Sequence, residues 1–129
     1  MFENVKIKIM KGYLFLEYPA CGTCRKAKKW LDEQKVNYTD RHIVEERPTC
    51  EELKIWFERS GLPLRKFFNT SGLLYKSMQL REKLDGMSEE EQLELLASDG
   101  KLVKRPLVIG EDFVLVGFKP EEWEKVLLK

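Results

Sequence analysis

The sequence predicts an α/β protein in which a mixed, four-stranded sheet is interrupted by a helical insertion. Three patterns support this fold class: strand, helix, strand over residues 13–43; helices over residues 48–100; and strand, strand, helix from residue 107 onward. The 129 residues are enough to bury the core of one domain. We expect that domain to have its core at about 12–47 and 101–129, and its insertion at about 48–100.

The first part of the chain predicts a βαβ unit. Tyr13–Tyr18 is an apolar run typical of a buried strand, and Arg25–Gln34 has Ala27 and Leu31 at helical spacing. Asn37–Ile43 then predicts a second strand. Because a crossover helix joins the two strands, we expect them to be parallel.

The middle of the chain predicts helices. Thr49 with Glu52, and Ser88 with Glu91, match the capping-box pattern that opens a helix. The expected helical segments are Cys50–Ser60, Leu64–Phe68, Leu73–Leu84 and Glu89–Ala97.

The last part of the chain predicts a hairpin and a helix. Leu107–Ile109 and Phe113–Val116 are apolar runs joined by the turn residues 110–112, and Pro120 suits the first position of a helix through Leu128. This order of elements is that of a thioredoxin-like, glutaredoxin-type fold with a helical insertion. In that fold a proline before the third strand faces the loop between the first strand and the first helix, and commonly follows a cis peptide bond. Pro106 occupies that place and is therefore a candidate substrate-binding residue.

Composition excludes several classes of function. The chain has 23 Lys plus Arg and 22 Asp plus Glu, so no basic excess favours direct nucleic-acid binding. Neither a signal peptide nor a membrane span is expected, because charged residues interrupt every apolar run. An odd count of three cysteines favours a thiol pair cycling in the cytoplasm over a secreted disulfide scaffold. The sequence leaves open whether translation begins at Met1 or Met10.

The strongest chemical signal is Cys21-Gly22-Thr23-Cys24, which lies between a predicted strand and a predicted helix. Cysteines three positions apart are one helical turn apart, close enough for a disulfide. The positive end of a helix lowers the pKa of a cysteine to about 3.5–7.5 in such motifs. Cys21 is therefore the candidate nucleophile and Cys24 the candidate resolving thiol.

Two other interpretations of these cysteines stay open. They could be ordinary buried thiols, or half of a zinc site. Zinc would need two more ligands, and only Cys50, His42 and carboxylates remain. We expect no bound metal or cofactor, and we interpret Cys50 and His42 as structural.

Three motifs together resemble the ArsC family of arsenate reductases, whose relatives include the Spx and MgsR regulators of Gram-positive bacteria. They are Pro19-Ala20-Cys21-Gly22-Thr23, Asn69-Thr70-Ser71-Gly72 and Lys104-Arg105-Pro106. The resemblance implies that Cys21 attacks arsenic or a disulfide sulfur. It also implies that Arg105 and Arg65 hold an oxyanion, since a guanidinium binds oxyanions through two donors.

The chain departs from those reductases at three places. Lys119 replaces a third oxyanion-binding arginine, keeping the charge without the planar fork. Cys24 replaces a serine and is shared with the Spx-like proteins. Glu17-Tyr18 replaces a His-Asn pair, and we expect the Glu17 carboxylate to lie near the nucleophile and disfavour anions there.

These observations support two functional hypotheses. The first is a thiol oxidoreductase that acts on a disulfide or an oxyanion through Cys21 and Cys24, with glutathione or another thiol as electron donor. The second is a redox-sensing regulator that binds RNA polymerase, at the C-terminal domain of its α-subunit. Spx-like regulators are expected to carry a longer tail than a chain ending at Lys129, which favours the enzyme.

Overall fold

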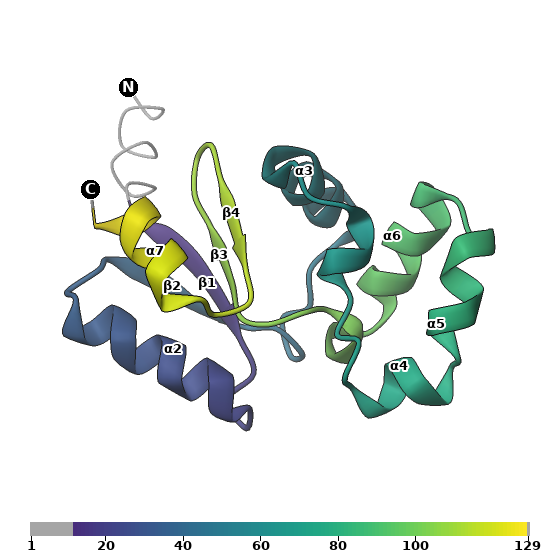
Figure 1. Ribbon diagram of the computed structural model, residues 1–129, viewed down its shortest axis with the longest axis horizontal. Coiled ribbons are helices and arrows are strands. Elements are labelled where there is room, and N and C mark those ends of the chain that lie inside the picture. Colours follow the sequence, from purple (N-terminus) through teal and green to yellow (C-terminus); the bar gives the residue numbers. More distant parts are fainter. Residues whose placement is uncertain (1–11, 129) are drawn as a thin grey trace.

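The computed structural model describes residues 12–128, and its sheet and helices form the α/β arrangement that the sequence predicts (Figure 1). The sheet has four strands in the order β2-β1-β3-β4. β1 and β2 are parallel, whereas β3 is antiparallel to both of its neighbours, so the sheet is mixed. The strands are β1 (Tyr13–Glu17), β2 (Tyr38–His42), β3 (Leu107–Ile109) and β4 (Val114–Val116).

The helices divide between the sheet and the insertion (Figure 1). Those of the sheet-bearing core are α2 (Gly22–Glu33) and α7 (Pro120–Leu127). Those of the insertion are α3 (Cys50–Ser60), α4 (Leu73–Ser77), α5 (Leu80–Lys83) and α6 (Glu89–Ser98), with 3-10 turns at Leu64–Phe67, Leu84–Gly86 and Gly100–Leu102.

The helix after the first strand starts at Gly22, earlier than the predicted Arg25. Its buried stripe is Cys24, Ala27 and Leu31, so a cysteine supplies the first apolar position of the helix. The amide of Arg25 donates to the carbonyl of Cys21 at 3.1 Å, which makes Cys21 the N-cap residue.

The single helix predicted over Leu73–Leu84 is wrong, because the chain breaks at Gln79 into α4 and α5. Gln79 adopts a left-handed backbone conformation with φ of 56°. Tyr75 and Leu84 are both buried, yet nine residues of continuous helix would place them about 180° apart around the axis. The break therefore allows both side chains to reach the same core.

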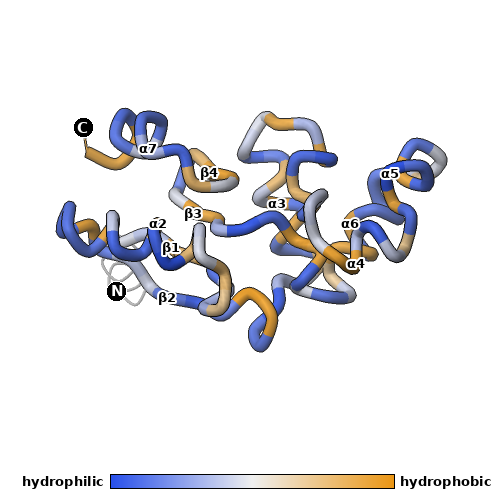
Figure 2. Tube along the Cα trace, turned by 60° about the horizontal axis from the view of Figure 1, so that its bottom comes forward, coloured by the Kyte–Doolittle hydropathy of each residue, from blue (hydrophilic) through white to orange (hydrophobic). Residues whose placement is uncertain are grey.

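Two apolar clusters lie on opposite faces of the sheet. Successive side chains of a strand point to opposite faces, so Phe15 packs with α2 and α7 while Leu16 packs with the insertion. In the same way, Val108 packs in the cluster with α2 and α7, and Leu107 packs in the cluster with the insertion. Figure 2 shows the resulting alternation of hydrophobic and hydrophilic residues along the helices.

Hydrogen bonds tie the insertion to the core beside β3. Phe68 pairs with Val103 as an isolated bridge, and the amide of Lys104 donates to the carbonyl of Phe67 at 2.8 Å. The insertion returns to the sheet at Gly100, where an added Cβ would lie 2.0 Å from the carbonyl oxygen of Ile43. These contacts place residues 62–72 next to residues 104–106.

Both predicted capping boxes are present, at Thr49 with Glu52 and at Ser88 with Glu91.

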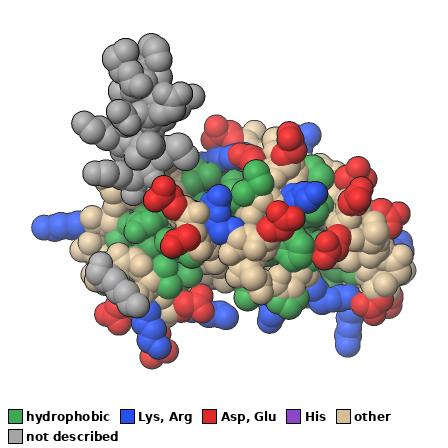
Figure 3. Space-filling model, turned by 90° about the horizontal axis from the view of Figure 1, so that it is seen from above, with side chains coloured by type: hydrophobic (Ala, Val, Ile, Leu, Met, Phe, Trp, Pro, Cys, Tyr) green, Lys and Arg blue, Asp and Glu red, His purple; other side chains and the backbone are tan. Residues whose placement is uncertain are grey.

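The face drawn in Figure 3 carries acidic and basic side chains together. Among residues 12–128, no helix is both long enough and apolar enough to cross a bilayer. The question of a start at Met10 falls on residues 1–11, outside the described part of the chain.

Candidate active site

Cys21 lies at the point where the chain leaves β1 and enters α2. Its amide donates to the carbonyl of Tyr18 at 2.8 Å, which folds the loop back so that the side chain stays partly exposed. Burial by itself raises the pKa of the Cys21 thiol. The opposing effects of the Cys24 amide and thiol, the Thr23 amide and the Arg105 guanidinium nevertheless hold that pKa below its usual value.

Cys24 lies one turn further along α2 and is fully buried. Burial is the main reason that its pKa is raised, to about 12, and a hydrogen bond and the charge of Cys21 raise it further. The amide of Tyr18 donates to the Cys24 sulfur at 3.4 Å. Both cysteines are free thiols in this structure. The loop therefore combines a partly exposed thiol whose pKa is lowered with a buried thiol whose pKa is raised to about 12.

Cys21 opens onto a cavity of about 860 Å³ between the sheet-bearing core and the insertion, here called the Cys21 cavity. Its wall includes five cationic side chains and one carboxylate, Glu122, so it favours anionic ligands. The cationic residues are Arg65, Lys66, Lys104, Arg105 and Lys119. The remaining lining residues are Thr23, Leu62, Pro63, Phe68, Asn69, Thr70, Ser71, Gly72, Val116, Gly117 and Phe118.

The cavity brings together four of the predicted site residues, Cys21, Arg65, Arg105 and Lys119. Cys24 lies behind the wall, within α2. Pro106 is also buried, and the peptide bond that joins it to Arg105 is cis, as the fold resemblance implies. The carbonyl of Pro106 accepts a hydrogen bond from the amide of Gly117 at 2.9 Å, which ties Pro106 to a residue of the cavity wall.

The guanidinium of Arg65 is bonded within the insertion. Its Nη2 donates to Asp85 Oδ1 at 2.7 Å, and its Nη1 lies 3.5 Å from the Tyr75 hydroxyl. Arg65 thus lines the Cys21 cavity, but an oxyanion that used its full fork would have to displace Asp85.

Glu17 does not lie where the sequence analysis expected it. It is buried on the α2 face of the sheet, where its carboxylate is 3.5 Å from Lys28 Nζ, and Lys28 also donates to Asp40 at 2.8 Å. Burial first, and then Asp40, raise the pKa of Glu17 to about 7. Glu17 does not line the Cys21 cavity, so the expected repulsion of anions by its carboxylate is wrong.

Tyr18 belongs to this site, although the sequence indicated it only as part of the Glu17-Tyr18 pair and suggested no role for it. The Cζ atom of Arg105 lies 4.9 Å from the centre of the Tyr18 ring. Lys66 and Lys104 were missed too, although each is the neighbour of a predicted arginine. Glu122 carries no sequence signal for the site, because only the packing of α7 brings it to the cavity.

Cys50 and His42 occupy structural positions. Cys50 packs partly buried against the core of the insertion. His42 Nδ1 accepts from the amides of Val44 and Glu45 at 3.2 and 3.1 Å, and so caps the end of β2. Across residues 12–128, no group of three or more His, Cys, Asp or Glu side chains is placed to hold a metal ion.

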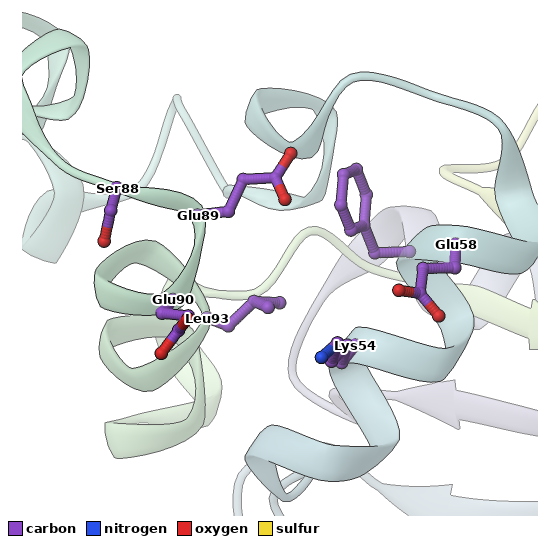
Figure 4. A pocket seen from close by; sticks show the side chains of 7 residues that line it. Lys54, Glu58, Ser88, Glu89, Glu90 and Leu93 are labelled. Atoms are coloured by element: carbon purple, nitrogen blue, oxygen red, sulfur yellow. The ribbon is translucent and has the colours of Figure 1, made fainter.

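A smaller hollow of about 190 Å³ lies between α3 and the start of α6 (Figure 4). Lys54 and Glu58 come from α3, and Glu89 and Glu90 from α6. No cysteine lines it, and three of its four charged side chains are carboxylates, so it offers no chemistry comparable with that of the Cys21 cavity.

Comparison with known proteins agrees with this description. The uncharacterized protein YusI of Bacillus subtilis is 58% identical over 111 residues, which are 86% of this chain and 94% of that protein. The regulatory protein MgsR of Bacillus subtilis is 32% identical over 115 residues, 89% of this chain and 90% of that protein. A crystal structure of a putative ArsC family related protein from Bacteroides fragilis superposes with a TM-score of 0.87 and 65% identity, covering 90% of this chain and 98% of that one.

The model of the ArsC family matches residues 16–126. That span runs from β1 to α7 and includes Cys21, the insertion and the cis bond before Pro106. Because the match covers most of the chain and every wall of the Cys21 cavity, this chain belongs to the ArsC family.

Proposed function

We propose that this protein is a cytoplasmic thiol oxidoreductase that reduces disulfides through Cys21 and Cys24. The observation that carries the proposal is the pairing of a partly exposed thiol of lowered pKa with a fully buried thiol one turn away. A thiolate is the nucleophile in thiol–disulfide exchange, and a second thiol within reach completes the exchange inside the molecule.

In the first step the Cys21 thiolate attacks one sulfur of a substrate disulfide. A new sulfur–sulfur bond forms, the substrate bond breaks, and the other substrate sulfur leaves as a thiolate that takes up a proton. Cys21 then no longer carries a negative charge, which removes one of the causes that raise the pKa of Cys24. Cys24 is therefore easier to deprotonate once the mixed disulfide has formed.

In the second step Cys24 loses its proton and attacks the Cys21 sulfur. The second substrate thiol leaves, and Cys21 and Cys24 are joined by a disulfide, so that the substrate has gained two electrons and two protons. Two molecules of an external thiol such as glutathione then reduce the Cys21–Cys24 disulfide. They leave joined to each other by a disulfide, and both cysteines return to the thiol state.

The Cys21 cavity supports a disulfide substrate that carries carboxylates. Its volume of about 860 Å³ is within the range of sites that hold small organic molecules, and its cations suit anionic groups on such a molecule. An arsenate ion would leave most of this volume unfilled. It would also meet an Arg65 that is bonded to Asp85, and a lysine at position 119.

The second candidate is a redox-sensing regulator that binds RNA polymerase, at the C-terminal domain of its α-subunit. Similarity to MgsR over 89% of the chain favours it. In this role the Cys21–Cys24 disulfide would report oxidation and no substrate would be turned over.

One preparation tests both candidates. Reduction of glutathione disulfide is followed in the reduced wild-type protein and in Cys21→Ser, Cys24→Ser and, as a matched control, Cys50→Ser. If the protein is the enzyme, Cys21→Ser should lose thiol–disulfide exchange, and Cys24→Ser should stop at the mixed disulfide with glutathione. Cys50→Ser should keep full activity. Binding to the isolated C-terminal domain of the polymerase α-subunit, with at most one glutathione disulfide reduced by each protein molecule even when dithiothreitol is supplied, would instead select the regulator.

A further inference from the structure

Tyr18 contacts the three residues on which the chemistry of the loop depends. Its carbonyl accepts from the Cys21 amide at 2.8 Å, and its amide donates to the Cys24 sulfur at 3.4 Å. Its ring faces the Arg105 guanidinium, with Cζ 4.9 Å from the ring centre. The first two contacts are made by the backbone and belong to any residue at this position. The third requires the side chain.

The Tyr18 ring is itself held in place. The ring of His42 packs edge-on against it, with 5.8 Å between the ring centres and 79° between the planes. His42 in turn is fixed by the amides of Val44 and Glu45, which both donate to its Nδ1. A side chain supported in this way presents one fixed face to its neighbour.

Apart from the Cys21 thiol, whose pKa it helps to lower, Arg105 has few other contacts that could fix its position. Its Nη1 lies 3.4 Å from the carbonyl of Lys101, which is long for a hydrogen bond. Within residues 12–128, no carboxylate lies close enough to form an ion pair with it. Arginine is long and has many rotamers, so the Tyr18 ring is the main contact that selects one of them.

We propose that Tyr18 is a positioning residue, whose ring holds the Arg105 guanidinium beside the Cys21 sulfur at the mouth of the cavity. This inference rests on the proposed thiol chemistry of Cys21. Placed there, the guanidinium stabilises the thiolate before attack and faces anionic groups of the substrate disulfide afterwards. The role needs the aromatic face of Tyr18 and not its hydroxyl.

The test measures how fast iodoacetamide alkylates Cys21 as a function of pH in the full reduced chain. Fragmentation of the tryptic peptides in the mass spectrometer distinguishes label on Cys21 from label on Cys24, which lies in the same peptide, and on Cys50. Tyr18→Leu removes the ring and keeps both backbone contacts, and it should raise the midpoint by about half a pH unit. Tyr18→Phe keeps the ring and should restore the wild-type midpoint.

Two controls separate positioning from general damage. Tyr13→Leu removes a partly buried tyrosine from the other end of β1 and should leave the Cys21 midpoint unchanged. In an Arg105→Leu background, where the midpoint is already raised, Tyr18→Leu should add no further shift, because the ring acts only through the guanidinium.

The possible failures are distinguishable. A wild-type midpoint near the free-thiol value of about 8.5 would remove the activated nucleophile and with it the proposed function. A low wild-type midpoint that rises in Arg105→Leu but not in Tyr18→Leu would leave that function standing and overturn the role of Tyr18. Circular dichroism checks that each variant folds. If Tyr18→Leu does not fold, Tyr18→Met replaces it in the comparison, because methionine also lacks an aromatic ring.

Discussion

Arg65 and Asp85 form a 2.7 Å ion pair at the edge of the Cys21 cavity, so one of the five cations of its wall is bound to a carboxylate of the insertion. Asp85 does not line the cavity itself. Both side chains are substantially exposed, and exposed pairs of this kind contribute about 0.2–1 kcal/mol. An anionic ligand that binds the guanidinium must therefore displace Asp85, which weakens its binding by a factor of up to about five.

We expect Asp85→Asn to bind anions more tightly than the wild-type protein, because Arg65 no longer has a charged partner. Isothermal titration with sulfate should show a dissociation constant lower by about two- to five-fold. Asp112→Asn, which removes an exposed carboxylate from the β3–β4 turn, is the matched control and should have no effect. Equal affinity in all three proteins would mean that Arg65 does not contribute to anion binding.

Mild peroxide should oxidise Cys21 and Cys24 to an intramolecular disulfide, since one thiol ionises readily and the other lies one helical turn away. The tryptic peptide of residues 12–25 contains both cysteines and should lose two hydrogens in mass spectrometry, then regain them with dithiothreitol. Cys50→Ser should behave like the wild-type protein. A bridge from Cys21 to Cys50 would show that Cys24 is not the resolving thiol.

Arsenate reduction should be slow in the wild-type protein, because Arg65 is engaged by Asp85 and Lys119 lacks a planar fork. Asp85→Asn combined with Lys119→Arg supplies two free guanidinium groups and should raise glutathione-dependent arsenate turnover several-fold. Exchange with glutathione disulfide, measured in parallel, should change little. Rapid arsenate reduction by the wild-type protein would contradict the assignment of a disulfide substrate.

Glu17 should make the stability of the protein depend on pH. Burial is the main reason that its pKa is raised from 4.5 to about 7 in the folded state. Protonated Glu17 therefore favours the folded state. This contribution to the free energy of unfolding is complete below about pH 4.5 and is lost as the pH rises through about 7. Glu17→Gln stays neutral and should avoid that loss. Between pH 5 and pH 8 the wild-type protein should therefore lose more stability than the variant, by about 1–3 kcal/mol.

Urea denaturation at pH 5 and pH 8 measures the effect of Glu17. Glu111→Gln, at an exposed position of the β3–β4 turn, should follow the wild-type protein at both pH values. If Glu17→Gln and the wild-type protein lost equal stability between the two, the Glu17 carboxyl would not take up its proton in this range.

Local signals in the sequence were enough to predict most of the fold. The capping boxes at Thr49 and Ser88, the hairpin turn at 110–112 and the strand-to-helix change at Cys21 depend on residues close together in the chain, and all appear in the structure. The cis bond at Pro106 was predicted from the fold resemblance and is also present.

Only the tertiary structure decided how the side chains of the site are paired. Whether Glu17 faces Cys21 or Lys28 depends on which face of the sheet it occupies, and Arg65 meets Asp85 only because the helix breaks between α4 and α5. Tyr18 and Arg105 are 87 residues apart and come together through the pairing of β1 with β3. The sequence by itself thus predicted the fold and the candidate residues Cys21, Cys24, Arg65, Arg105 and Lys119. Long-range packing decided which partner each charged side chain meets, because charges interact through space and not along the chain.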